Sequence, residues 1–187
     1  MRLGAGKGHG LFVAIVACFL VYAVPCARAQ PASAPEYEVK AAFIYNFAKF
    51  VEWPEGAFSS GNAAINLCVT DEGPSMKAFE SIRGKTVKGR EIVVGQCDEI
   101  QEIAACHILF VSSSGKKRPG QILEAVKGRR ILTVGDEKGF ARLGGIINFI
   151  TVDNKISFEI NPDAAKRAGL EISSKLLKLA EIVREEP

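Results

Sequence analysis

Short apolar runs alternate with helical segments between residues 64 and 134, and this alternation restricts the fold more than any other feature of the sequence. Each apolar run has the length of a buried strand. Pro119 opens one of the helical segments, at a position where proline is favoured. Such alternation is typical of a parallel sheet with helices on both faces. The apolar runs are 64–69, 92–94, 106–111 and 131–134.

The pattern changes after residue 145. Two extended runs, 146–152 and 155–160, are separated only by Asp153-Asn154, which predicts a β-hairpin. Pro162 then opens a predicted last helix, and the following residues supply its apolar stripe. We therefore expect one α/β domain over residues 36–187, with a largely parallel sheet, a C-terminal β-hairpin and a C-terminal helix. The stripe consists of Ile172, Leu176, Leu179 and Val183.

An aromatic-rich helix is predicted over residues 36–53, where Pro54 ends it. Helical spacing assigns most of its rings to the core. The rings occupy more than one helical face, however, and aromatic side chains are enriched in protein interfaces. The candidate contact surface for a partner protein consists of Tyr45, Phe47, Phe50 and Trp53.

The first 29 residues have the layout of a secretory signal peptide. A positively charged start precedes an apolar run over 11–24, and a small-x-small cleavage site follows at 27–29. The run is shorter than the roughly 20 residues that span a bilayer. An uncleaved anchor and a lipoprotein acylated on Cys26 are the alternatives. We expect cleavage after Ala29, a flexible segment over 30–35, and a periplasmic protein without membrane insertion.

Removal of this leader would leave the chain without net charge. The sequence holds 24 Lys and Arg residues against 21 Asp and Glu residues. Arg2, Lys7 and Arg28 lie in the leader, which contains no acidic residue, so 21 basic residues would face 21 acidic ones. Nucleic-acid binding requires a basic excess. We therefore expect no nucleic-acid partner.

Groups suited to catalysis are few after residue 29. His107 is the only histidine there, and neighbouring Cys106 would point to the opposite face of the same strand. This disfavours a Cys–His nucleophilic pair and makes His107 a core or interface residue. One histidine and three cysteines also fail to make a zinc site of the usual kinds. We expect no catalytic residue, no metal and no cofactor, and hence no enzyme.

A polar crevice is predicted at the carboxyl ends of the parallel strands. Thr70, Asp71, Ser113 and Asp136 each follow a predicted strand, and open α/β sheets bind ligands at this edge. The loop over 112–117 lacks the first glycine and the final hydroxyl of a phosphate-binding P-loop. An acid–base pair of Asp71 and Asp136 is a weaker hypothesis, because acids at strand ends often cap helices.

Three cysteines remain after the leader, so at most one intramolecular disulfide can form. An exported protein meets an oxidising compartment, where such a bond is permitted. A crossover helix is expected between Cys97 and Cys106, and its span of about 10 Å exceeds the ~7 Å limit for a disulfide. A bond between Cys68 and Cys106 is feasible if their strands are neighbours. Cys97 would then be a buried thiol.

The chain resembles the YfiR family of periplasmic proteins along nearly its whole length after the leader. The most specific part is the aromatic segment that ends in Trp53-Pro54. The matching segments are 39–54, 84–87, 106–110, 131–134, 144–149, 158–161 and 168–177.

This resemblance implies a repressor that binds the periplasmic region of a membrane diguanylate cyclase, lowers cyclic-di-GMP and restrains biofilm formation. It also implies an α/β fold, a homodimer and a disulfide between Cys68 and Cys106. A second disulfide of some members would fall after Gly145, where this chain has no cysteine.

Three hypotheses for the function follow. A repressor requires an exposed aromatic patch. A small-ligand-binding protein requires a pocket lined by Thr70, Ser113 and Asp136. A hydrolase is disfavoured by the scarcity of catalytic groups.

Overall fold

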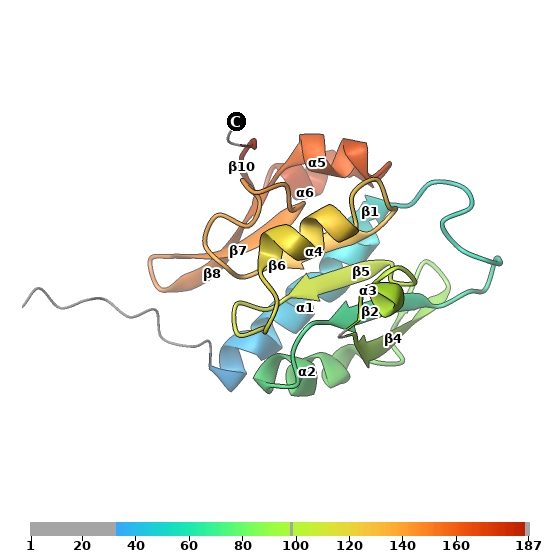
Figure 1. Cartoon of the computed structure of the whole chain (residues 1–187), viewed down its shortest axis with the longest axis horizontal. Helices are drawn as coiled ribbons and strands as arrows, with labels where there is room; N and C mark the ends of the chain where they lie inside the picture. The colour runs from blue at the N-terminus through green and yellow to red at the C-terminus, as the bar shows by residue number, and fades with distance from the viewer. Residues whose placement is uncertain (1–32, 98, 186–187) are drawn as a thin grey trace, which may run out of the picture. The chain divides into compact units, whose positions relative to one another are not determined.

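An eight-stranded sheet forms the centre of the computed structural model, which describes residues 33–97 and 99–185 (Figure 1). The strand order is β10-β8-β7-β6-β5-β2-β4-β3. The five strands from β7 to β4 are mutually parallel, β10 is parallel to β8, and two antiparallel pairs, β7–β8 and β3–β4, complete the sheet. The predicted, largely parallel sheet is thus confirmed. The strands are β2 (Ile65–Val69), β3 (Thr86–Val87), β4 (Arg90–Gln96), β5 (Ile108–Val111), β6 (Leu132–Gly135), β7 (Ile147–Val152), β8 (Lys155–Ile160) and β10 (Glu181–Ile182).

Helices cover both faces of this sheet, as predicted (Figure 1). Helix α1 (Ala34–Phe50) and helix α2 (Pro74–Phe79), which continues as the 3-10 helix η1 (Glu80–Ile82), pack on one face. Helices α3 (Ile100–Ile103) and α4 (Pro119–Ala125) lie on the other face. Two short helices, α5 (Pro162–Arg167) and α6 (Ser174–Leu177), follow the hairpin.

The strands separate two hydrophobic clusters because successive side chains of a strand point to opposite faces. In β5, Ile108 and Phe110 belong to the cluster under α1, whereas Leu109 and Val111 belong to the cluster under α4. The cluster under α1 is the larger one and contains most of the buried aromatic rings.

The predicted hairpin is present as β7 and β8. Its register runs from Ile147 opposite Ile160 to Val152 opposite Lys155. Asp153 and Asn154 form the two-residue turn with φ of 48° and 60°. Aspartate and asparagine tolerate this left-handed backbone, which matches the twist of the flanking strands.

The aromatic helix is shorter at its C-terminal end than predicted. It ends at Phe50, and strand β1 (Val51–Glu52) follows before Pro54. The backbone carbonyl of Phe50 accepts a hydrogen bond from Ser173 N at 2.9 Å, and β1 pairs antiparallel with β9 (Glu171–Ile172). Tertiary pairing therefore replaces the last helical turn.

The prediction of one long C-terminal helix is wrong. The chain after Pro162 forms α5, β9, α6 and β10 in turn. Gly169, with φ of +70°, ends α5 in the left-handed conformation that terminates many helices. Ser173 then caps α6 by accepting a hydrogen bond from Lys175 N. Of the expected stripe, Leu176 and Val183 are buried, whereas Leu179 is 70% exposed.

The predicted leader over 1–29 and residues 30–32 of the expected flexible segment lie outside the described residues. Helix α1 begins at Ala34, inside that segment. Among the helices of residues 33–97 and 99–185, none combines the length and the apolar character needed to cross a bilayer.

Candidate functional site

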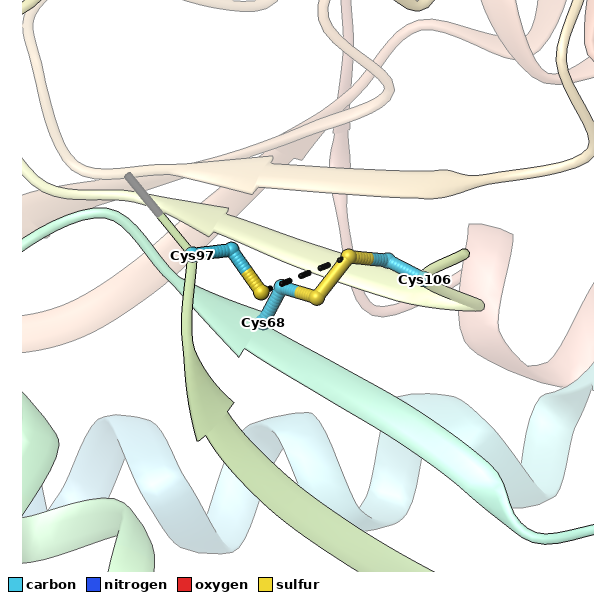
Figure 2. Close-up of side chains that lie close together, drawn as sticks. All are labelled: Cys68, Cys97 and Cys106. Carbon is cyan, nitrogen blue, oxygen red and sulfur yellow. Dashed lines mark hydrogen bonds between the residues drawn. A yellow bond between two sulfur atoms is a disulfide. The ribbon is translucent and has the colours of Figure 1, made fainter. Parts of the chain in front are cut away.

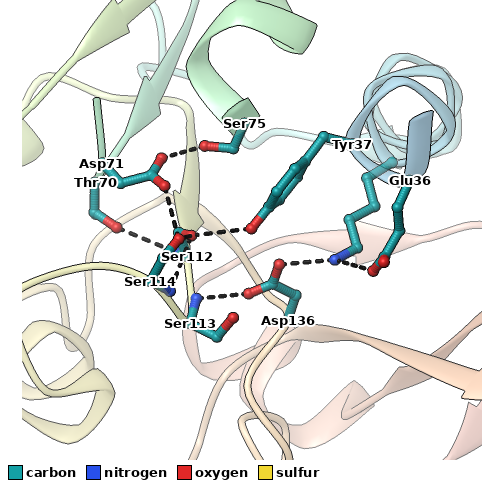
Figure 3. Close-up of polar contacts among 10 residues, drawn as sticks. Glu36, Tyr37, Thr70, Asp71, Ser75, Ser112, Ser113, Ser114 and Asp136 are labelled. Carbon is teal, nitrogen blue, oxygen red and sulfur yellow. Dashed lines mark hydrogen bonds and ion pairs between the residues drawn. The ribbon is translucent and has the colours of Figure 1, made fainter. Parts of the chain in front are cut away.

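The polar residues predicted at the carboxyl ends of the strands lie together and are joined by hydrogen bonds of the loop 112–114 that follows β5 (Figure 3). Ser112 N donates to Thr70 Oγ1 at 3.1 Å, which links the ends of β5 and β2. Ser114 Oγ donates to Asp71 Oδ2 at 2.9 Å. Ser113 N donates to Asp136 Oδ1 at 2.6 Å and ties the same loop to the end of β6.

Helix α1 supplies the basic partner of this cluster. Lys40 Nζ lies 2.8 Å from Asp136 Oδ2 and 2.8 Å from Glu36 Oε1. The side chains of Lys40 and Asp136 are 4% and 2% exposed. Burial lowers the pKa of Lys40, but the charge of Asp136 and the hydrogen bonds to both carboxylates outweigh burial and raise the pKa overall. Lys40 is therefore charged at neutral pH.

Tyr37 of α1 approaches the same loop. Its hydroxyl lies 3.4 Å from Ser112 Oγ, and burial is the largest cause of its raised pKa. Asp71 also accepts a hydrogen bond from Ser75 Oγ at the start of α2. The cluster thus connects two helices to the ends of three strands. Its hydroxyl and carboxylate groups form most of their hydrogen bonds with one another.

A cavity of 340 Å³ opens beside this cluster. Lys40, Asp136, Phe149 and Ile150 contribute to its lining, together with Glu36, Lys138, Thr151 and Ile156. Thr70, Asp71 and Ser113 are not among the residues that line it. Of the predicted crevice residues, Asp136 alone borders this cavity.

The aromatic residues of the candidate contact surface differ in burial. Phe47 has no exposed surface, and its ring centroid lies 4.9 Å from that of Phe158 and 5.8 Å from that of Phe149. Phe47 is therefore a core residue and cannot contact a partner. Tyr45, Phe50 and Trp53 are partly exposed and pack against the edge of the core.

Neighbouring groups fix the position of the Tyr45 side chain, although part of its surface stays exposed to solvent. Its hydroxyl donates to the carbonyl oxygen of Thr86 at 3.2 Å, and Lys49 Nζ lies 3.9 Å from its ring centroid. A second ammonium, that of Lys85, lies 5.3 Å from the same centroid. A partner would meet a fixed ring bordered by two basic side chains.

A second cavity of 450 Å³ lies beside Trp53 and was not predicted from the sequence. Phe58, Lys88 and Arg90 also line it. The guanidinium of Arg90 lies 3.8 Å from the Phe58 ring centroid. Trp53 Nε1 is buried and has no hydrogen-bond partner among the described residues. Phe58 lies in a segment rich in glycine and serine, where no periodicity marks it as a lining residue.

The hydrogen bonds and packing of His107 give it a structural role, in agreement with the core or interface position predicted for it. Its Nδ1 accepts a hydrogen bond from Asn66 N at 3.0 Å, so Nε2 carries the proton and donates to the carbonyl oxygen of Ala57 at 3.2 Å. Burial is the main cause of the lowered pKa of His107. Its ring also stacks on Phe58, with centroids 4.3 Å apart.

The three cysteines form one buried cluster (Figure 2). A disulfide joins Cys68 of β2 to Cys106, with Cα atoms 5.9 Å apart. The predicted separation of Cys97 from Cys106 is wrong, because their sulfurs lie only 4.0 Å apart. Helix α3 between them is a single turn of four residues, and Cys106 precedes β5 instead of opening it. Both residues therefore reach the same face of β2 (Figure 2).

The fold and these clusters define an α/β domain that carries a buried ion pair, a buried disulfide and a partly exposed aromatic edge. The family model described as YfiR/HmsC-like matches residues 37–181. The chain therefore belongs to the YfiR/HmsC-like family, a family of periplasmic regulators without catalytic function.

Comparison with solved structures supports the fold. The chain is similar to a conserved domain protein from Vibrio cholerae O1 biovar El Tor, with a TM-score of 0.51 and 12% identity over 80% of this chain. An ABC domain from Streptococcus pneumoniae in complex with L-Trp matches 68% of this chain at 11% identity, and its TM-score of 0.44 is too low for an argument about the fold. The chain spans 60% and 57% of the lengths of these two proteins.

Proposed function

We propose that the protein is an exported regulator that binds the periplasmic region of a membrane diguanylate cyclase and represses it, thereby lowering cyclic-di-GMP. The observation that carries this proposal is the family match over residues 37–181, which spans nearly the whole described domain. The cleaved leader over 1–29 and periplasmic action as a homodimer are part of the same proposal.

The contact surface that we propose consists of Tyr45, Phe50 and Trp53. These rings lie along the C-terminal half of α1 and just beyond it, and each keeps part of its surface exposed. Aromatic side chains of this kind often dominate binding energies, because they bury a large area with few rotatable bonds. Lys49 and Lys85 beside Tyr45 favour an acidic segment on the cyclase.

The anchoring of α1 supports this assignment. The N-terminal half of the helix is fixed to the sheet by Lys40 and Asp136, and its C-terminal half by Phe47. A surface that is already ordered before binding loses little conformational entropy on association.

An affinity pull-down tests the proposal. The tagged protein is incubated with detergent-solubilised membranes, and captured proteins are identified by mass spectrometry. We expect recovery of a membrane protein with a cytoplasmic cyclase domain. Tyr45→Ala should reduce recovery, whereas Gln121→Ala, an exposed position on α4 at the opposite face, should not. Equal recovery with both variants would remove Tyr45 from the interface, and absence of any cyclase would contradict the proposal.

A second candidate function is binding of a small ligand beside Asp136. The 340 Å³ cavity lined by Lys40, Asp136 and Phe149 favours it, because it combines charged groups with an apolar wall. Asp136 would then be held in place by its hydrogen bond with Ser113 N. The loop that carries Ser113 follows β5 and is itself held by hydrogen bonds to Thr70 and Asp71. A thermal-shift screen of small molecules tests this function, and a hit must lose its effect in Ile156→Ala, at a partly exposed position of the same cavity.

A further inference from the structure

The loop over residues 53–64 forms much of the wall of the 450 Å³ cavity beside Trp53. The loop contains no helix or strand, so side chains from other elements must hold it in place. Arg90 of β4 and His107, directly before β5, both donate hydrogen bonds to its backbone carbonyl groups. The shape of the cavity therefore depends on these two side chains.

Arg90 fixes the C-terminal half of the loop. Its Nη1 donates to the carbonyl oxygens of Ser60 at 3.0 Å and of Ala63 at 2.8 Å. A guanidinium stays charged at every pH at which the protein is folded, because its ordinary pKa exceeds 12. The attachment by Arg90 is therefore independent of pH.

His107 fixes the N-terminal half of the loop, and it can do so only as a neutral ring. Its Nε2 donates to the carbonyl oxygen of Ala57, and its ring stacks on Phe58 at an interplanar angle of 14°. Its Nδ1 accepts from the backbone N–H of Asn66 at 3.0 Å. Both nitrogens of a protonated imidazole are donors, and a backbone N–H cannot accept. A proton on Nδ1 therefore places two donors against each other and expels the ring from this position.

The charged groups around His107 oppose its protonation. Burial is the largest cause of its lowered pKa; the hydrogen bond to Ala57 acts against this effect, and the positive charge of Arg90 acts with it. The loop contributes one titratable side chain, that of Glu55, which is exposed, and β2 contributes no charged residue. Arg130, which precedes β6, is exposed and is a second cation near the loop. Among the described residues, no carboxylate forms a hydrogen bond or ion pair with His107.

We propose that protonation of His107 releases the N-terminal half of the loop 53–64 and opens the cavity beside Trp53 in mildly acidic solution. The departing ring takes with it the hydrogen bond to Ala57 and the stacking on Phe58, whereas Arg90 keeps its two hydrogen bonds. A change of one charge thus moves one half of the loop and leaves the sheet in place.

The sign of the pH dependence follows from the lowered pKa. In the released loop His107 has its ordinary pKa near 6.5, and in the closed loop its pKa is lower. The stability of the closed loop is therefore fully present above pH 6.5 and is lost as the pH falls through the pKa of the closed form. Trp53 belongs to the contact surface proposed above, but the release requires no partner and can be tested without one.

Fluorescence of Trp53 as a function of pH tests the proposal, because Trp53 is the only tryptophan in the chain and its ring centroid lies 6.0 Å from that of Phe58. All samples carry His9→Gln, which leaves His107 as the only histidine. Between about pH 7.5 and pH 5, above the ordinary range of carboxyl groups, we expect the emission to shift to longer wavelength with a midpoint below 6.5. Quenching by acrylamide should increase with the same midpoint, and far-ultraviolet circular dichroism should stay constant.

Two variants and one further measurement complete the experiment. His107→Asn keeps an acceptor oxygen for Asn66 N but does not titrate, and its fluorescence should not change over this range. Glu55→Gln removes the titratable side chain of the loop and should keep the transition of the parent protein. The NMR titration of His107 in the parent protein gives its pKa without any change at that position, and it should agree with the fluorescence midpoint.

Four results would overturn the proposal. The first is a parent protein without a transition, and the second is a transition that persists in His107→Asn or disappears in Glu55→Gln. The third is an NMR midpoint that differs from the fluorescence midpoint. The fourth is a loss of circular dichroism over the same range, because it would show unfolding of the whole domain instead of release of one loop.

Discussion

At the scale of single residues, Lys40 fixes α1 to the sheet through its ion pair with Asp136. Lys40→Met would leave the buried carboxylate of Asp136 without its cation. Removal of one partner of a buried pair costs about 3–5 kcal/mol. We expect a loss of this size in urea unfolding. Lys49→Met, on an exposed part of the same helix, should change stability by less than about 0.5 kcal/mol, and a similarly small effect of Lys40→Met would refute the anchoring role.

The same pair predicts a pH dependence. The pKa of Lys40 is raised in the folded protein, so its contribution to stability is fully present below the unfolded value near 10.5. This contribution is lost as the pH rises through the higher folded pKa. Unfolding curves recorded from pH 9 upward should therefore show a larger alkaline loss of stability in the wild-type protein than in Lys40→Met, where the raised pKa of Tyr37 still contributes. Parallel curves for the two proteins would contradict this assignment.

The disulfide between Cys68 and Cys106 is a second contribution of single residues to the stability of the fold. Cys68→Ser should destabilise the fold by about 2–5 kcal/mol, the usual range for small exported domains. Cys97→Ser removes no covalent bond and should cost less. Thermal unfolding of both variants under oxidising conditions checks this order. An unchanged melting curve for Cys68→Ser would show that the bond contributes little.

At the scale of elements, Gly169 separates α5 from β9 where an uninterrupted helix was predicted. Its φ of +70° is costly for any residue with a Cβ atom. Gly169→Ala should destabilise the protein by about 1 kcal/mol. Gly120→Ala, inside α4 with open space around its Cα, should have no cost or a small benefit. Urea midpoints compare the two, and equal midpoints would argue against a conformational role for Gly169.

The elements also show what the sequence could and could not predict. The hairpin was predictable because Asp153 and Asn154 tolerate the left-handed turn that joins two strands. The end of the chain was predicted wrongly as one helix because the spacing of Ile172 and Leu176 fits a helical stripe. In the structure, Ile172 pairs with β1 and Leu176 lies in α6. Cys97 lies close to Cys106 because α3 is short, and no local sequence pattern indicates the length of that helix.

At the scale of the whole molecule, burial divides the aromatic segment into a core part and a surface part. Phe47→Ala should destabilise the protein by about 3–5 kcal/mol, because the ring is fully enclosed. Tyr45→Ala should cost much less stability than Phe47→Ala and weaken capture of the cyclase. Thermal unfolding and pull-down on the same samples separate these effects. A large loss of stability in Tyr45→Ala would place that ring in the core.

The polar cluster at the strand ends shows how far the candidate site could be predicted from the sequence. Strand order was enough to bring Thr70, Asp71, Ser113 and Asp136 to one edge of the sheet. Their hydrogen bonds depend on the conformation of the loop that follows β5, and the ion pair of Asp136 with Lys40 depends on how α1 packs. Both are tertiary properties. The sequence therefore located the edge but not the ion pair that occupies it.

The most direct test of the repressor proposal measures cyclic-di-GMP in cells that lack this protein. Each culture is complemented with the wild-type chain, Tyr45→Ala or Gln121→Ala, and the nucleotide is quantified by mass spectrometry. We expect the wild-type chain and Gln121→Ala to lower cyclic-di-GMP to the same level, and Tyr45→Ala to lower it less at equal abundance. A level that does not respond to the presence of the wild-type chain would contradict repression of a cyclase.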